Sequence, residues 1–253
     1  MPIVLKSERE LALMKRGGEI VAEVLAEIRD KLRPGMSTQD VDDIAESTVT
    51  GLGAKASFKG LYGFPASICI SINEEIVHGI PSKERILNEG DIVSLDFGAI
   101  YQGLHADSAV TLPVGKVNDE ARRLLVCCET ALNRGIAQAR AGKRLGDISW
   151  AIQAYGESKG YGIVRQYVGH GVGRSLHEEP QVPNFGPPGR GIALRAGMTL
   201  AIEPMLNQGT EKTEVLGDKW TVVTEDRKLS AHFEHTIAVT EGEPLVLTRL
   251  PAA

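Results

Sequence analysis

The sequence contains one pattern twice, 107 positions apart: Glu89-Gly90-Asp91-Ile92-Val93-Ser94-Leu95-Asp96 and Ala196-Gly197-Met198-Thr199-Leu200-Ala201-Ile202-Glu203. An earlier block, residues 33–41, recurs at the same offset as residues 140–148, with a glycine and an aspartate in matching places. A gap-free offset shared by two separated blocks is hard to obtain by chance. The repeat therefore predicts a protein built from two similar halves.

Each half also carries a pair of acidic residues. Residues 107–115 resemble residues 234–242 at an offset of 127, which leaves about 20 extra residues between the acids of the second half. On this alignment Asp96 corresponds to Glu203, and Asp107 corresponds to Glu234. Each half is therefore expected to supply one acid pair to a common site.

The composition is that of an ordinary globular protein. The chain has 253 residues, of which 42% are hydrophobic and 24% are charged, and this length allows a large core. We expect a single domain over residues 1–253, made of two repeat-related halves at about 8–115 and 119–242. A net charge of −5 and a pI near 5.7 argue against nucleic-acid binding through a basic surface.

The sequence also restricts the compartment. No stretch approaches the roughly 18 apolar residues of a membrane span, and the N-terminus lacks the apolar core of a secretory signal. The three cysteines, Cys69, Cys127 and Cys128, are too sparse for a disulfide framework and are expected to be reduced. We therefore expect a cytoplasmic protein without membrane contact.

Apolar residues at helical spacing predict a long helix followed by a shorter one in each half, with a glycine after each long helix. The expected helices cover residues 8–32, 38–51, 119–140 and 147–159. The expected strands cover residues 67–72, 91–97, 107–112, 161–168, 198–202, 220–223 and 233–239. These elements predict an α+β protein in which helices cover one face of a mainly antiparallel sheet.

The first acid pair is expected to lie on a β-hairpin. The turn falls around Tyr101-Gln102-Gly103. If its centre lies between Tyr101 and Gln102, Asp96 stands directly opposite Asp107. Directly opposed residues have Cβ atoms about 4.5 to 5.5 Å apart.

Four converging carboxylates indicate a metal site. They could not all stay ionised in a partly buried place without cations, and two divalent ions would supply the missing charge. Such ions lie about 3.5 to 4 Å apart when carboxylates bridge them, a spacing suited to activating a shared water. The alternative is that each acid is a solvated surface charge. That alternative is weakened because Asp96 and Glu203 come at the ends of apolar strands.

Histidines flanked by glycine or proline support the metal site. His170 lies in a Gly-His-Gly segment, where glycines allow the backbone to bend sharply, and is expected to be a fifth ligand. His177 follows seven residues later, and His78 precedes Gly79 far upstream. A lone histidine in a loop is more often structural. Three of them beside four strand acids favour a hydrolase.

With these motifs the sequence resembles the type I methionine aminopeptidases over nearly its whole length. The matching segments, in order, are residues 71–81, 91–98, 105–109, 169–180, 197–204 and 230–236. The resemblance implies the pita-bread fold, with two pseudo-symmetric halves and an antiparallel sheet covered by helices. That architecture agrees with the internal repeat.

The resemblance also implies roles for individual residues. Two divalent metal ions would be bound by Asp96, Asp107, His170, Glu203 and Glu234, with Asp107 and Glu234 bridging them. Glu203 would act as general base, His177 would stabilise the tetrahedral intermediate, and His78 would contact the substrate near the scissile amide. The ligand set is compatible with Mn, Fe, Co or Zn. Asn73 and Ser230 match a family position for a structural monovalent cation, although either could equally be a turn hydrogen-bonder.

The methionine pocket departs from the commonest family pattern. Phe58 stands where the family often has Cys, while Leu61 and Phe64 stand where it often has Tyr. Leu176 stands where it often has Phe, and Cys69 and Trp220 match. The pocket stays apolar and able to take a thioether. Ordinary core packing is the alternative explanation for Phe58 and Leu61.

The implied activity is removal of the initiator methionine from nascent chains whose second residue is small. The implied partner is the N-terminal peptide of such chains at the ribosome, and the protein is expected to be a monomer without sequence-specific nucleic-acid binding. Two alternatives are an Xaa-Pro peptidase of the same fold and a non-catalytic pita-bread binding protein. Loss of ligands would mark the second, and none is lost.

Overall fold

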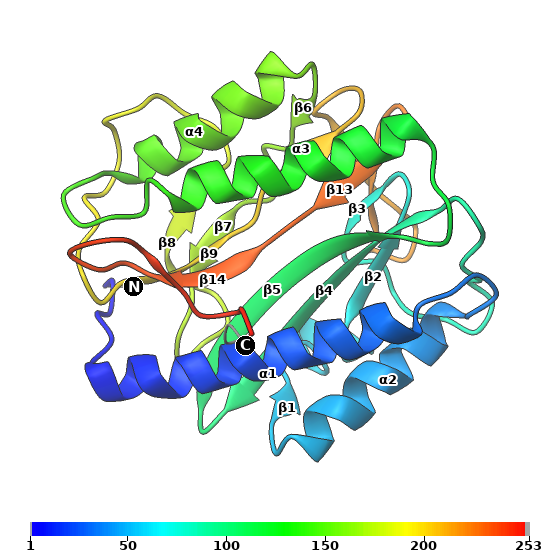
Figure 1. Ribbon diagram of the computed structural model, residues 1–253, viewed down its shortest axis with the longest axis horizontal. Helices are drawn as coiled ribbons and strands as arrows, with labels where there is room; N and C mark the ends of the chain where they lie inside the picture. Colours follow the sequence, from blue (N-terminus) through cyan, green and yellow to red (C-terminus); the bar gives the residue numbers. More distant parts are fainter. Residues whose placement is uncertain (1, 251–253) are drawn as a thin grey trace.

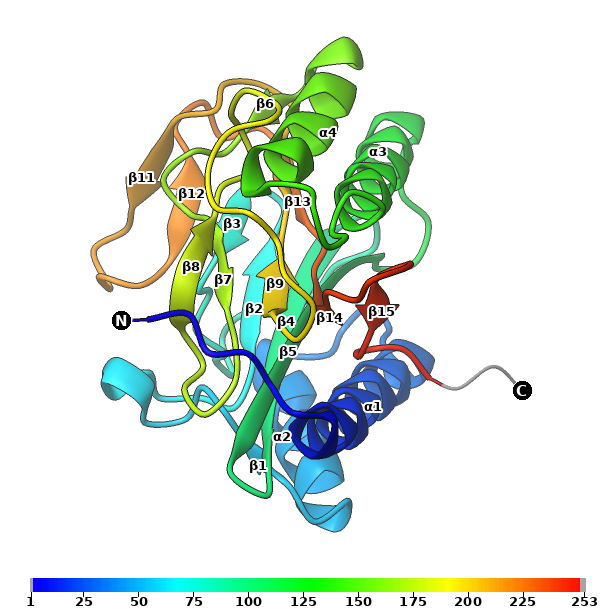
Figure 2. The same ribbon diagram turned by 90° about the vertical axis from the view of Figure 1, so that its left-hand side faces the viewer.

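A computed structural model describes residues 2–250 as a layer of helices packed on a layer of strands (Figure 1). Turned by 90°, it shows α1 and α3 on one side and β8, β11 and β12 on the other (Figure 2). The helices are α1 (Glu8–Lys31), α2 (Thr38–Gly51), α3 (Asp119–Ile136) and α4 (Leu145–Ser158), with a short 3-10 turn at Leu61–Gly63. Within the described residues no helix combines the length and apolarity that crossing a bilayer requires.

All paired strands are antiparallel, which confirms the expected class of fold. Hydrogen bonding divides them into sheets with orders β1-β4-β2 (β5 also on β4), β13-β10-β6, β11-β12-β3 and β15-β14-β9-β7-β8. The strands are β1 (Lys55–Ala56), β2 (Cys69–Ile72), β3 (Glu75–Val77), β4 (Ile92–Tyr101), β5 (Leu104–Pro113), β6 (Gly162–Ile163), β7 (Gly169–Gly171), β8 (Glu178–Val182), β9 (Thr199–Ile202), β10 (Met205–Asn207), β11 (Thr213–Val215), β12 (Val222–Thr224), β13 (Ser230–His232), β14 (His235–Ala238) and β15 (Leu245–Val246).

Each half has its own core between helices and strands. One face of α1, which includes Ile20, Val24 and Ile28, is buried with residues of α2, β2, β4 and β5. The corresponding faces of α3 and α4 are buried with residues of β9, β10, β13 and β14. The apolar stripe along each helix, repeated about every 3.6 residues, therefore fixes which side faces the sheets.

The internal repeat is confirmed in the hydrogen bonding. Helices α2 and α4 begin and end 107 positions apart. Isolated bridges join Ser37 to Ile86 and Arg144 to Ala193, again at that offset. A glycine with positive φ precedes the bridge in each half, where a left-handed conformation would strain any other residue.

Some expected bounds were wrong. Helix α3 ends at Ile136, four residues early, and α4 begins at Leu145 rather than at Asp147. Of the expected strand 161–168, only Gly162–Ile163 pairs. Strands β7 and β8, which carry several glycines and a proline, were not expected at all.

The predicted hairpin register was also wrong. The turn is Gln102-Gly103, because Tyr101 pairs with Leu104. Both turn residues have positive φ, 49° and 81°, as a two-residue hairpin turn of type I′ requires. Asp96 therefore lies opposite Ala109 and not opposite Asp107. The two acids are diagonal neighbours on one face of the hairpin, about 7 to 8 Å apart at Cα.

The second block of the repeat follows a different offset from the one expected. Ile92 pairs with Pro113 in the first half, and Thr199 pairs with Ala238 in the second. Ile92 and Thr199 are 107 positions apart, which keeps Asp96 equivalent to Glu203. Pro113 and Ala238, however, are 125 positions apart and not 127.

This register changes the partners of the other two acids. Asp107 corresponds in position to His232, and Glu234 corresponds to Ala109. The predicted match of Asp107 with Glu234 was therefore wrong. The sequence alignment matched Asp107 with Glu234 because both are acidic. The pairing of the strands, however, decides which positions are structurally equivalent.

The two halves meet along a seam formed by residues 107–111 of β5 and residues 232–236, which include the start of β14 (Figure 1). At its centre the amide of Glu234 donates to the carbonyl of Ala109 at 2.9 Å, and the amide of Ala109 donates back at 3.4 Å. The seam is thus antiparallel, and it lies beside the acids of both halves.

Threonine hydroxyls replace main-chain partners on either side of that centre. The hydroxyl of Thr236 accepts from the amide of Asp107 at 2.9 Å and donates to its carbonyl at 2.8 Å. The hydroxyl of Thr111 does the same for His232, at 2.8 and 2.7 Å. At the 125-residue offset these are two copies of one contact, and they satisfy all four buried main-chain groups.

Candidate metal centre and substrate pocket

A cavity of about 520 Å³ opens between the halves. All twelve residues expected at the site line it: Phe58, Leu61, Phe64, Cys69, His78, Asp96, Asp107, His170, His177, Glu203, Trp220 and Glu234. The structure therefore brings together side chains that are up to 176 positions apart in sequence.

The floor of the cavity has the geometry of a cation site. Ligand atoms of Asp107, His170 and Glu234 all lie within 4.8 Å of one another. The Nε2 atom of His170 lies 3.6 Å from Oε1 of Glu203. One carboxylate oxygen each of Asp96, Asp107 and Glu234 is sealed from water and has no hydrogen-bond partner among the described residues. Buried, unpartnered carboxylate oxygens fit divalent cations, which would satisfy them.

The pKa values of the four carboxyl groups also favour bound cations. Burial raises the pKa of Asp107 to about 7. Burial also raises the pKa values of Asp96, Glu203 and Glu234 well above their usual range, and the charge of Asp107 raises them further. So many carboxylates in one buried cluster oppose one another's ionisation unless positive charge is added.

The four acids occupy different positions relative to the strands. Asp107 lies in β5 and Glu234 between β13 and β14. Glu203 follows the last residue of β9, as expected, but Asp96 lies inside β4 and not at its end. The carbonyl of Glu203 accepts from the buried side-chain amide of Asn184 at 3.0 Å. Glu203 is therefore fixed through its main chain, while its carboxylate points into the cluster.

His170 lies in strand β7 and not in the expected loop. Its Nδ1 donates to the carbonyl of Gly171 at 2.9 Å, because a carbonyl can only accept. Nε2 is thereby left with its lone pair toward the acids, as a metal ligand requires. A Cβ on Gly169 would meet the carbonyl of Ala201 at 2.3 Å, so this glycine serves close strand packing rather than a bend.

The two other histidines stand at the wall of the cavity. The ring of His177 lies edge-on to that of His170, with centroids 4.5 Å apart. His78 has a φ of 61°, in the left-handed region, and its ring packs edge-on to Tyr167. Burial, with a contribution from His177, lowers the pKa of His78 to about 4. His78 is thus neutral near pH 7 and able to donate one hydrogen bond.

The rest of the wall is apolar. Phe58, Phe64, Cys69 and Leu176 form one buried cluster with Ala66, and the side chains of Leu61, Ile80 and Trp220 pack against it. Trp220 contacts Phe64 edge-on, with centroids 5.2 Å apart, and lies 6.4 Å from His78. The apolar cluster therefore adjoins the cation site directly.

Replacing Trp220 with alanine is expected to raise KM for a methionyl peptide about tenfold, through loss of one aromatic contact of about 1.4 kcal/mol. Steady-state kinetics on Met-Ala-Ser measures this change in KM. Trp150→Ala is the matched control, because Trp150 lies exposed on α4. An unchanged KM in Trp220→Ala would show that Trp220 does not border the substrate.

The loop that carries Leu176 and His177 is held by a buried ion pair. Lys6 Nζ donates to Oε2 of Glu178 at 2.6 Å. The other oxygen of Glu178 accepts from the amides of Arg174 and Ser175 at 2.7 and 3.2 Å. The segment before α1 therefore fixes a wall of the cavity.

Two residues that line the cavity, Tyr62 and Tyr167, and one buried beside Glu203, His232, were not assigned a role from sequence. Tyr62 is exposed at the rim, and Tyr167 lies beside His78. His232 is buried, with Nε2 3.7 Å from Oε2 of Glu203 and no partner for either ring nitrogen among the described residues. Counting the repeat at 125 would have placed His232 in the position of Asp107.

Asn73 and Ser230 are adjacent, since the amide of Ser230 donates to the carbonyl of Asn73 at 2.8 Å. The side chain of Asn73 bonds to Asp91 and to the amide of Ile92. The hydroxyl of Ser230 donates to Asn207. Any monovalent cation here would therefore rely on main-chain carbonyls.

Comparison with known proteins identifies the family. The model of metallopeptidase family M24 matches residues 12–241. Methionine aminopeptidase 1 of Bacillus subtilis is 51% identical over 248 residues, which are 98% of this chain and 100% of that protein. The chain belongs to the methionine aminopeptidases of family M24.

Solved structures agree with this M24 assignment. The crystal structure of methionine aminopeptidase from Thermotoga maritima superimposes with a TM-score of 0.97 at 46% identity, covering 98% of this chain and 100% of that one. Xaa-Pro dipeptidase from Bacillus anthracis gives 0.78 at 25% identity, but the match covers only 63% of its chain. The expected pita-bread fold of this M24 member is confirmed, and the Xaa-Pro alternative is not favoured.

Proposed function

We propose that the protein removes the N-terminal methionine from peptides and nascent proteins whose second residue is small. The observation that carries this proposal is the junction of two surfaces in one cavity. Unpartnered carboxylates form its floor, and the apolar cluster around Phe58, Phe64 and Leu176 forms its wall. An unbranched thioether side chain suits such a wall.

Asp96, Asp107, His170, Glu203 and Glu234 would hold two divalent cations. When bound, these ions supply Lewis acidity toward the scissile carbonyl, lower the pKa of a shared water, and anchor the free α-amino group. The choice among Mn, Fe, Co and Zn depends on availability as much as on the ligands.

The side chains around this centre would carry the remaining steps. Glu203 would accept the proton of the attacking water and pass it to the leaving amine. His177 would donate a hydrogen bond to the developing oxyanion, and His78 would donate one near the scissile amide. Both rings already face the cavity, so little reorganisation is needed.

The wider setting is proposed from the family relation. The protein would act in the cytoplasm as a monomer, on nascent chains at the ribosome. Both halves would work as one catalytic domain, since the seam passes beside the acids of each. A structural monovalent cation would also bind near Asn73 and Ser230.

A peptide assay tests the proposal. The purified, metal-loaded protein is expected to release methionine from Met-Ala-Ser and to leave Met-Leu-Ser and Ala-Pro peptides largely uncut. Released amino acid is quantified by chromatography. Preference for Ala-Pro would support the Xaa-Pro alternative, and failure to cut any of the three would favour a non-catalytic binding protein.

A further inference from the structure

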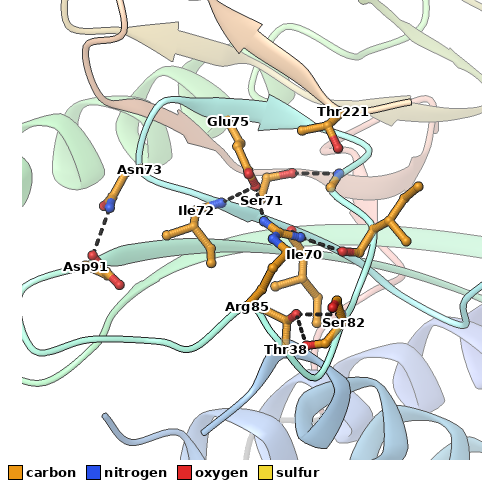
Figure 3. Close-up of polar contacts among 12 residues, drawn as sticks. Thr38, Ile70, Ser71, Ile72, Asn73, Glu75, Ser82, Arg85, Asp91 and Thr221 are labelled. Atoms are coloured by element: carbon orange, nitrogen blue, oxygen red, sulfur yellow. Dashed lines mark hydrogen bonds and ion pairs between the residues drawn. The ribbon is translucent and has the colours of Figure 1, made fainter. Parts of the chain in front are cut away.

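Arg85 lies between β3 and β4, and its half-buried side chain reaches the turn between β2 and β3 (Figure 3). None of its atoms lines the cavity. Its guanidinium nevertheless contacts the segment that carries His78 at two places and the strand β2 at a third. Figure 3 shows these contacts converging from β2, from β3 and from the chain that follows them.

The contacts bracket His78 on both sides. One terminal nitrogen of Arg85 donates to the carbonyl of Ile80 at 2.6 Å and to that of Ile70 at 3.2 Å. The other donates to Glu75. Glu75 precedes His78 by three residues, Ile80 follows it by two, and Ile70 lies on the facing strand β2.

Glu75 extends these contacts to the turn between β2 and β3. The carboxylate oxygen that Arg85 contacts also accepts from the amide of Ile72 at 2.8 Å, at the end of β2. Burial raises the pKa of Glu75, and the charge of Arg85 opposes that rise. The contact between Arg85 and Glu75 therefore ties the turn between β2 and β3 to Arg85.

The segment so held is under strain. His78 is in the left-handed region, which residues other than glycine rarely adopt unless their surroundings fix it. A Cβ on Gly79 would meet the carbonyl of Ile70 at 2.1 Å, so the chain passes very close to β2 here. The amide of Gly79 donates to the hydroxyl of Ser71 at 3.2 Å. Main-chain contacts on both sides of His78 thus decide where its ring points.

We infer that Arg85 is a positioning residue for His78, acting by fixing the main chain on both sides of it. The inference rests on the proposed role of His78 in catalysis. A planar fork of donors is needed, because one ammonium group cannot serve a carboxylate and two carbonyls with the same geometry. Lysine at this position keeps the charge and loses the fork.

The test is a double-mutant cycle between Arg85→Lys and His78→Ala, measured as kcat/KM on Met-Ala-Ser. Arg85→Lys alone is expected to lower kcat/KM by about ten- to a hundredfold, since a misplacement near 1 Å has that cost. In the His78→Ala background the same change is expected to have almost no further effect. Metal content and the unfolding midpoint are measured for every variant.

Arg140→Lys is the matched control, because Arg140 also forms an ion pair, with Glu243, away from the cavity. It is expected to leave kcat/KM unchanged. If Arg85→Lys does not fold, Glu75→Gln takes its place in the cycle, since it removes the ion pair and keeps the shape.

The outcomes separate two failures. Full activity in His78→Ala refutes the proposed role of His78 itself. Reduced activity in His78→Ala, combined with a silent or additive effect of Arg85→Lys, overturns the inference and leaves the half-buried ion pair with a role in stability alone. Non-additivity with normal metal content supports it.

Discussion

Replacing Glu203 with alanine is expected to lower kcat on Met-Ala-Ser by about 10³-fold or more, because proton transfer and part of the cation site are lost together. Its carboxylate lies between the rings of His170 and His232, at 3.6 and 3.7 Å. No other acid of the cluster is placed between two imidazoles in this way. Steady-state kinetics and calorimetric titration with Mn²⁺ measure the two losses separately.

Glu203→Gln separates the two roles further. Glutamine keeps the volume and one ligand oxygen but cannot accept the proton, so kcat should fall while part of the metal affinity remains. Glu243→Ala is the control, because Glu243 is an exposed acid paired with Arg140. Near-normal kcat in Glu203→Gln would refute the general-base role.

Removal of the metal ions by a chelator is expected to abolish turnover and to lower the unfolding midpoint. The cluster then keeps its mutual repulsion without compensation. At a metal concentration one hundred times Kd, binding stabilises by about 2.7 kcal/mol, which corresponds to about 5 to 10 °C for a chain of this size. Differential scanning calorimetry with and without Mn²⁺ measures the shift.

Asp107→Asn serves as the comparison, since it removes one charge at the centre of the cluster. Its midpoint should respond to Mn²⁺ much less than that of the unmodified protein. Trp150→Ala, far from the cluster, should respond fully. Equal responses in all three proteins would show that the ions stabilise some other site.

The sequence carried enough information for the fold class and for naming twelve residues that line one cavity. Periodicity of apolar residues gave the helices, and the 107-residue repeat gave the two halves. The apolar strand before each acid explained why Asp96 and Glu203 face inward. Those signals are local in sequence, which is why they could be found by counting.

What the sequence missed depends on contacts between distant segments. The hairpin register turned on which two of three residues form the turn, a choice made by positive φ at Gln102 and Gly103. The position of His232 beside Glu203 was missed because alignment by residue type matched Asp107 with Glu234. The pairing of Lys6 with Glu178 spans 172 positions and leaves no periodic trace in sequence.

The seam between the halves has a wider consequence. Its threonine contacts are self-complementary, the arrangement found at the isologous interface of a twofold dimer. In a true homodimer, each position would carry the same residue twice. Because both copies lie in one chain, one can keep Asp107 where the other has His232. A single chain can therefore keep the symmetric scaffold of a dimer and still carry different chemical groups at equivalent positions of its two halves.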